Sequence, residues 1–325
     1  MERSGFKFTK IFSGFLSILL IVALIAAIFF RQDVYDWWRL RSYSPPSEIV
    51  ALAKKTTMTE QGKKTFYVAH PSVTDAETFN QNCHISEFSI ILGCYITGGN
   101  IYIYDVTDKR LSGIHEVTAA HEMLHVAYER LSAEERSNLN QLLDKAYQDV
   151  NDARIRSTIE QYRQNDASSV PNELHSILGT EVSDLPSALE NHYAKYFSNR
   201  QSVVKLSQRY EREFSNRQNR VTEIDRALTQ LKLTIDANQS ELSAMNATLT
   251  SQRQELDALR VGDDTAAYNA RVSSYNQLVD SYNSLVERTK SDIARYNNLV
   301  SERNSLVVEV QDLVEAIDST PETIK

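Results

Sequence analysis

Glycine and proline are scarce in this sequence, with 9 and 6 residues respectively in a chain of 325. Because glycine weakens helices and proline breaks them, their near absence from the last third of the chain favours long helices there. Concentrated positive charge is also missing, since the formal net charge is −8. Phosphate binding requires a basic face, so this charge argues against nucleic acid as the main partner.

Several catalytic signatures are absent too. The sequence has no G-x-S-x-G nucleophile elbow, no Walker-type phosphate loop and no four-cysteine metal cluster. Its only cysteines, Cys83 and Cys94, flank an apolar stretch. Outside the cytoplasm such a pair can form a disulfide, and two unrelated buried thiols are the alternative. The pair therefore favours a location outside the cytoplasm for most of the chain.

Charge is also lacking from residues 11 to 30, IFSGFLSILLIVALIAAIFF. At about 1.5 Å per residue, a helix of this length spans a hydrocarbon core of ~30 Å. Trp37 and Trp38 follow it, as interfacial aromatic residues do. We therefore expect a single-pass membrane protein, with an N-terminal tail over residues 1 to 10, a transmembrane helix over 11 to 30 and an extracytoplasmic catalytic domain. A cleaved signal peptide is the alternative.

The region after this segment has strand patterns followed by helical patterns. Residues 31 to 57 are predicted to form a juxtamembrane linker, and residues 58 to 200 a catalytic domain. Gly98-Gly99 separates two apolar runs, which predicts a β-hairpin. The predicted strands cover residues 65 to 69, 88 to 96 and 100 to 106. The predicted helices cover residues 114 to 131, 133 to 150, 152 to 163, 172 to 180 and a segment starting at Asp184.

The last segment, residues 201 to 325, has apolar residues at alternating steps of three and four, which is typical of a coiled coil. The pattern breaks at Gly262-Asp263-Asp264 and then resumes, so we expect an antiparallel helical hairpin. In its second arm the predicted seam contains Val272, Tyr275, Val279, Tyr282, Val286, Ile293, Tyr296, Val300, Val307, Val310, Val314 and Ile317. A row of leucines is predicted beside this seam, formed by Leu278, Leu285, Leu299, Leu306 and Leu313. Such a wide stripe predicts a protein partner or self-association, and a solvated spacer is the alternative.

The sequence His121-Glu122-Met123-Leu124-His125 is an H-E-x-x-H motif inside a predicted helix. Residues four apart share one face of a helix, so both imidazoles can bind the same ion. Glu122 is rotated by about 100° and can instead accept a proton from a water molecule at the metal. Two histidines with a carboxylate ligand suit Zn²⁺ best, and iron or manganese are the alternatives. We predict one catalytic zinc ion with Glu122 as the general base.

This motif needs a third metal ligand, and no histidine follows it until His175. The segment AAHEMLHVAY resembles the first active-site helix of the gluzincin, or thermolysin-like, metallopeptidases, and NELHSILGT resembles their second. The resemblance implies that His121, His125 and Glu173 bind zinc in a zincin-type domain. Glu181 is the rival third ligand. In the family an aspartate four residues after the ligand glutamate orients a histidine, and this chain has Ile177 at that position.

The predicted function is that of a membrane-anchored zinc metallopeptidase that hydrolyses peptide bonds in a protein or peptide substrate. The predicted fold class is an α+β zincin-type domain with an N-terminal transmembrane helix and a C-terminal coiled-coil hairpin. By the resemblance, His192 and Tyr193 are candidates for stabilising an oxyanion. One alternative is a coiled-coil scaffold or interaction protein of the cell envelope with a vestigial or structural metal domain. Another is a metal hydrolase acting on a non-peptide amide.

Overall fold

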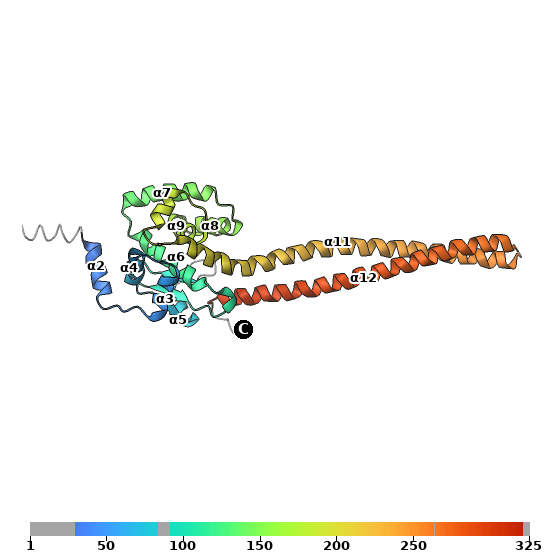
Figure 1. Cartoon of the computed structure of the whole chain (residues 1–325), viewed down its shortest axis with the longest axis horizontal. Coiled ribbons are helices and arrows are strands. Elements are labelled where there is room, and N and C mark those ends of the chain that lie inside the picture. Colours follow the sequence, from blue (N-terminus) through green and yellow to red (C-terminus); the bar gives the residue numbers. More distant parts are fainter. Residues whose placement is uncertain (1–29, 84–91, 263, 321–325) are drawn as a thin grey trace, which may run out of the picture. The chain divides into compact units, whose positions relative to one another are not determined.

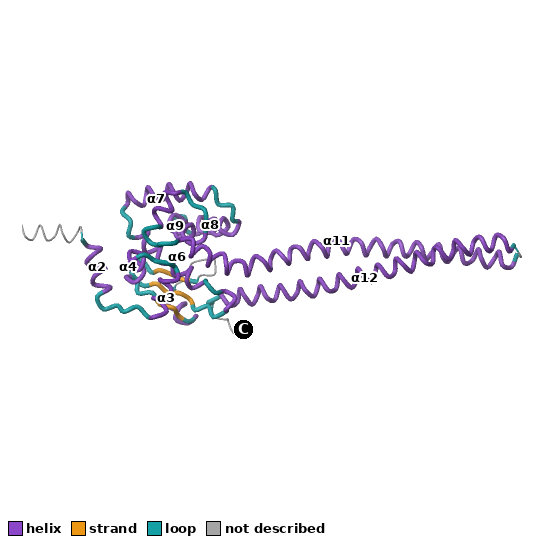
Figure 2. The backbone as a smooth tube through the Cα atoms, viewed as in Figure 1, coloured by secondary structure: helices purple, strands orange, loops and turns teal. Residues whose placement is uncertain are grey.

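The computed structural model describes residues 30–83, 92–262 and 264–320. It divides into two compact units, one formed by the described residues up to Glu211 and from Ala316, the other by Arg212–Glu315 (Figure 1). Helices account for 77% of the described residues. The strands in the described residues all belong to the first unit (Figure 2).

Short helices form most of the first unit. These are α2 (Arg31–Leu40), α3 (Ser47–Lys55), α4 (Glu60–Val68), α5 (Ala76–Asn82), α6 (Ile114–Glu129), α7 (Ala133–Gln148), α8 (Ala153–Asn165), α9 (Val170–Glu181) and α10 (Ser187–Tyr193). α6 is the central helix, because α3, α4, α9 and two strands all pack against it. A capping box begins α7, in which the side chains of Ser132 and Glu135 each accept a hydrogen bond from the other residue's backbone amide.

The sheet has three strands, β1 (Ser72–Thr74), β2 (Gly93–Tyr95) and β3 (Ile101–Tyr104), in the order β1-β3-β2. β2 and β3 are antiparallel, with Gly93 opposite Ile103, which confirms the predicted hairpin for its described part. β1 pairs with β3 in parallel and was not predicted. A disulfide joins Cys83 to Cys94 and so ties the end of α5 to β2.

The predicted fold class is wrong, because the described chain is mainly helical and its sheet is small and mixed rather than a plain hairpin. Residues 65 to 69, predicted as a strand, fall largely within α4. Thr59 caps this helix by accepting a hydrogen bond from the Gly62 amide at 3.0 Å. Gly62, Thr65 and Phe66 are buried, a helical spacing that outweighs the β-propensity of Phe and Tyr.

The predicted localisation in a membrane is contradicted as well. No helix within residues 30–83, 92–262 and 264–320 is both long enough and apolar enough to cross a membrane. α11 (Arg200–Val261) and α12 (Thr265–Ile317) have the length, but charged residues occur throughout both. The segment that carried the prediction, residues 11 to 30, lies outside the described residues except for Phe30.

Part of the predicted linker, residues 31 to 57, belongs to the folded first unit. α3 packs against α6 and buries Ile49 and Ala53 completely. Just after α3, Met58 pairs with Phe197 in an isolated β-bridge. These contacts include apolar burial, which a solvated linker would lack.

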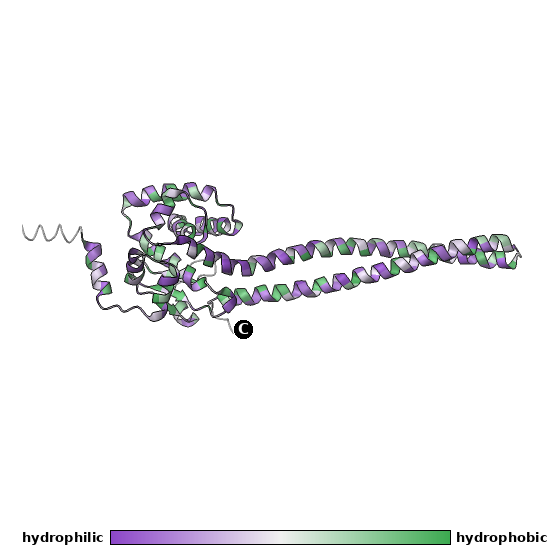
Figure 3. Ribbon diagram, in the orientation of Figure 1, coloured by the Kyte–Doolittle hydropathy of each residue, from purple (hydrophilic) through white to green (hydrophobic). Residues whose placement is uncertain are grey.

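The second unit is an antiparallel hairpin of α11 and α12, as predicted (Figure 1). Ion pairs link the two helices, Arg217 with Glu309 at 2.8 Å and Arg220 with Glu302 at 2.7 Å. Apolar residues recur along both helices (Figure 3).

The predicted seam of α12 is wrong by one column. The leucine row faces the hairpin interior, since Leu285 is 3% exposed and Leu313 fully buried. The valine and isoleucine column predicted as seam is less buried, and Val307 is 43% exposed. Both columns repeat every seven residues, so the heptad pattern alone could not distinguish them.

Candidate metal centre

The H-E-x-x-H residues lie in the second half of α6, as predicted. His121, Glu122 and His125 each offer a ligand atom, and these atoms all lie within 4.8 Å of one another. The helix is buried on most sides, and Ala119, Ala120 and Leu124 are inaccessible to solvent. Two imidazoles in such surroundings need polar partners, because an unpaired buried polar group is destabilising.

Glu173 of α9 supplies the carboxylate nearest to both histidines. Its Oε2 lies 3.7 Å from His121 Nε2, and its Oε1 lies 3.6 Å from His125 Nε2. Ligands bound at about 2.0–2.2 Å around a tetrahedral ion are themselves separated by roughly 3.3–3.5 Å. The observed separations are close to that value and beyond ordinary hydrogen-bonding distance. These two separations match the spacing of ligands around one small cation.

The electrostatics around Glu173 also fit a cation. The side chain is almost fully buried, and burial alone would raise its pKa. His125 and His121, with a hydrogen bond from Tyr162 of α8, outweigh burial and bring the pKa below its usual value. Glu173 is therefore an ionised carboxylate at neutral pH, the form that binds a metal.

Close packing of α9 on α6 places Glu173 at this point. Gly179 is the contact residue, because a Cβ atom there would lie 2.5 Å from Leu124 Cδ1 and 2.7 Å from Tyr193 Cε1. The two helices can approach this closely only because position 179 has no side chain. This close spacing between the helices brings Glu173 on α9 to the two histidines on α6.

Strand β2 lies directly against the general-base candidate. A Cβ atom at Gly93 would be 2.5 Å from Thr118 Cγ2 and 2.8 Å from Glu122 Oε1. Glu122 itself is only 4% exposed. Sequence reasoning did not single out Gly93, and the only available signal was a glycine at the start of a predicted half-buried strand.

Ser176 is a second residue that sequence reasoning missed. Its Oγ lies 3.3 Å from Nδ1 of His125, the nitrogen that faces away from Glu173. Ser176 is fully buried on α9, three residues after Glu173. By the gluzincin resemblance, the residue four positions after the ligand glutamate would contact a histidine. That position is Ile177 here, and Ser176, one residue earlier, makes the contact with a histidine instead.

The rival ligand Glu181 lies elsewhere, in an ion pair with Arg154. Arg154 also contacts Glu211 at 3.3 Å, so one guanidinium joins two carboxylates. Attraction to these carboxylates raises the Arg154 pKa despite the opposing effect of burial. The structure therefore brings Glu173, and not Glu181, to the two histidines.

The two oxyanion candidates both contact His175. The hydroxyl of Tyr193 donates to the backbone oxygen of His175 at 2.7 Å, and His192 Nε2 lies 2.9 Å from His175 Nε2. Burial lowers the pKa of His175 well below its usual value and that of His192 to about 4. Both imidazoles are therefore neutral at pH 7, and one ring donates a hydrogen bond to the other.

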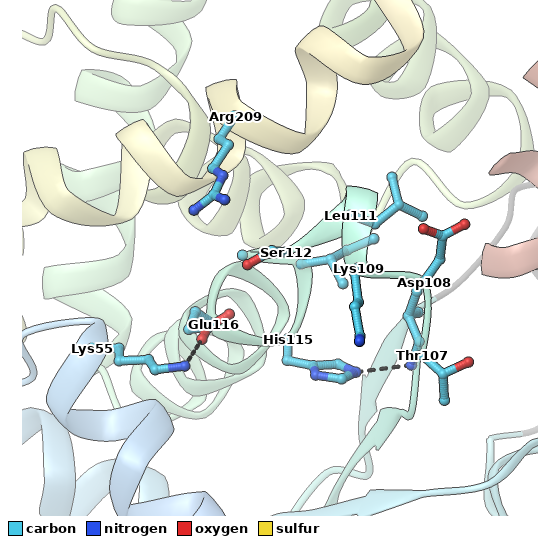
Figure 4. Close-up of a pocket in the computed structure, with 12 residues that line it drawn as sticks. Lys55, Thr107, Asp108, Lys109, Leu111, Ser112, His115, Glu116 and Arg209 are labelled. Carbon is cyan, nitrogen blue, oxygen red and sulfur yellow. Dashed lines mark hydrogen bonds and ion pairs between the residues drawn. The ribbon is translucent and has the colours of Figure 1, made fainter.

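A separate cavity of about 340 Å³ opens at the start of α6 (Figure 4). His115 lines it and accepts a hydrogen bond from the Val106 amide at 2.8 Å, while Lys55 pairs with Glu116 at 2.6 Å. His115 thus joins the start of α6 to the segment that follows β3. The metal-centre residues do not line this cavity.

In comparisons with known proteins, no family model matches the sequence, and no curated protein or solved structure matches the chain.

Proposed function

We propose that this chain is a zinc-dependent peptidase that hydrolyses peptide bonds at the α6–α9 site. The observation that carries the proposal is the position of Glu173, whose two oxygens lie 3.7 and 3.6 Å from the Nε2 atoms of His121 and His125. The H-E-x-x-H motif points to His121 and His125, and the resemblance to gluzincins adds Glu173. Glu173 belongs to a different helix, so its position is independent of the motif's own spacing.

The donor set supports zinc as the ion. Two imidazole nitrogens and one carboxylate are the protein ligands of many catalytic zinc sites, in which a fourth position stays open. Harder ions such as Mg²⁺ and Ca²⁺ prefer oxygen ligands throughout. When bound, zinc supplies Lewis acidity, which polarises a carbonyl group and makes water more acidic.

The position of Glu122 supports the proposal that it acts as the general base. Glu122 directly follows His121 on α6, so its side chain points away from the helix face that both histidines share. Its carboxylate can therefore reach a water molecule beside the ligands. It accepts a proton from that water and passes it to the departing amine. Glu122 is almost completely buried, and low local polarity strengthens its interactions with the reacting groups.

The direct test compares the wild-type chain with Glu122→Gln, using an unfolded protein such as casein as the substrate. We expect the variant to retain stoichiometric zinc and to lose hydrolysis by at least a hundredfold, consistent with removal of a general base. Glu129→Gln is the matched control, because Glu129 is another α6 carboxylate and bonds to the Tyr95 hydroxyl. Equal hydrolysis by wild type and Glu122→Gln would contradict the proposed mechanism.

A further inference from the structure

Helix α12 carries a β-branched column that the hairpin leaves only partly covered. It contains a valine or isoleucine at every seventh position, namely Val272, Val279, Val286, Ile293, Val300, Val307 and Val314. None of these residues is buried, and three of them, Ile293, Val307 and Val314, are 38%, 43% and 38% exposed. A two-helix hairpin does not need this column, because the neighbouring leucine row, in which Leu285 and Leu313 are buried, faces its interior.

On one side, this column is bordered by residues that are almost all uncharged. The positions three residues before each member are Asn269, Asn276, Asn283, Lys290, Asn297, Asn304 and Gln311, so only Lys290 is ionic. We call the surface formed by the valine and isoleucine column and this mainly asparagine column the valine–asparagine strip. Two charged residues of α11 already have ionic partners within the hairpin. Asp225 pairs with Arg303 of α12, and Lys232 pairs with Asp236 of α11 itself.

We propose that the valine–asparagine strip is a self-association surface, on which a second copy of this chain docks antiparallel. A partner of opposite charge would require ionic residues along the strip, and only Lys290 is present. A second copy carries the same net charge of −8, and an uncharged face lets the two copies approach with the least repulsion. Asparagine amides both donate and accept hydrogen bonds, so two identical asparagine rows can pair with each other.

The dimensions of the strip suit a helical dimer. From Val272 to Val314 it extends roughly 63 Å at about 1.5 Å per residue. With a helix about 10 Å wide, each copy would bury on the order of 600 Å². This is somewhat below the roughly 800 Å² per partner of a standard interface, so the dimer should dissociate at micromolar rather than nanomolar concentrations.

Lys290 decides the orientation. In a parallel pairing the two Lys290 side chains would face each other, and like charges in contact are destabilising. An antiparallel pairing centred on Ile293 places Lys290 opposite Asn297 of the second copy, and Val286 opposite its Val300. The twofold axis of the dimer then passes through the centre of the column, at Ile293, and a closed symmetric dimer results.

The first test measures the sedimentation of the full chain across a range of concentrations. The strip variant combines Ile293→Glu, Val300→Glu and Val307→Glu. The matched control combines Ala294→Glu, Ser301→Glu and Val308→Glu, each one residue later on an exposed face of the same helix. We expect the wild type and the control to dimerise similarly, and the strip variant to dimerise at least tenfold more weakly. Circular dichroism of all three chains establishes that the hairpin remains helical.

The second test uses disulfide crosslinking, for which the native cysteines do not interfere because they are bonded to each other. Under oxidation we expect Ile293→Cys to crosslink with itself. Val286→Cys alone should not crosslink, whereas Val286→Cys combined with Val300→Cys should. Crosslinking of Val286→Cys alone would overturn the antiparallel arrangement.

Three results of the sedimentation test would overturn the proposal. In the first, the wild type stays monomeric up to about 100 µM, well above the expected dissociation constant. In the second, the strip variant and the matched control lose association equally, which would indicate a general charge effect. In the third, the strip variant dimerises like the wild type, which would place the contact elsewhere on the chain.

Discussion

Ser176 Oγ lies 3.3 Å from His125 Nδ1, on the side of the imidazole that faces away from Glu173. A hydrogen bond at this nitrogen fixes the tautomer and orientation of the ring, so that the other nitrogen is ready to bind a metal. The site therefore has a supporting contact in addition to its three proposed ligands.

Replacing Ser176 with alanine should weaken zinc binding. Loss of a hydrogen bond to a ligand histidine typically lowers metal affinity by about 10–100-fold, and we expect at least tenfold here. Competition with a chromophoric chelator measures this affinity directly. Ser183→Ala, at a partly exposed serine that bonds to Asp184, is the control and should leave the affinity unchanged. Equal affinity in the two variants would show that Ser176 does not position His125.

Glu173 and Glu181 should differ sharply as zinc ligands. Glu173→Ala removes the carboxylate that lies between the two histidines, so we expect loss of stoichiometric zinc after dialysis against a weak chelator. Glu181→Ala leaves that group in place and breaks only the contact with Arg154. Metal content by mass spectrometry distinguishes the two. Zinc retained by Glu173→Ala and lost by Glu181→Ala would reverse the assignment.

An alanine at Gly93 should damage the site through steric overlap. Its Cβ would lie 2.5 Å from Thr118 Cγ2 and 2.8 Å from Glu122 Oε1, so β2 or α6 must shift. Overpacking of this kind costs about 1–3 kcal/mol of unfolding free energy, and displacement of Glu122 should also reduce hydrolysis. Gly262→Ala is the control, because its nearest neighbour would be 3.6 Å away. Urea denaturation gives both free energies, and equal stability of the two variants would contradict the prediction.

His192 should make the folded chain less stable in acid. Burial lowers its folded pKa to about 4, below the unfolded value of about 6.5, so the unfolded state binds a proton first. The contribution of His192 is fully present above pH 6.5 and is lost as the pH falls to 4, by about 3 kcal/mol at most. His192→Gln should therefore show a smaller decrease in unfolding free energy between pH 6.5 and 4. Parallel curves for variant and wild type would count against this account.

The disulfide between Cys83 and Cys94 should stabilise the first unit. It joins residues 11 apart in the sequence, and loop closure of that length predicts a contribution of about 3 kcal/mol. Cys83→Ala combined with Cys94→Ala should lower the unfolding free energy by this order, as measured in guanidinium without reductant. The same free energy with and without the disulfide would refute the prediction.

Local patterns in the sequence determined the helices from α6 onward and the first two proposed ligands. His121 and His125 share a face of α6 because they are four residues apart, a relationship set within a single helical turn. The capping box of α7 and the break near Gly262 are equally local. Each depends on residues close in the chain, so it could be predicted without the rest of the fold.

Only the tertiary structure decided the remaining features, because they depend on residues distant in the sequence. Glu173 and Glu181 belong to the same helix, and the close packing of α9 on α6 at Gly179 brings Glu173 to the histidines. On α12, the leucine and valine columns share one heptad period, and packing against α11 determines which column is buried. α4 is helical because its apolar residues pack against α6, although its sequence favours a strand.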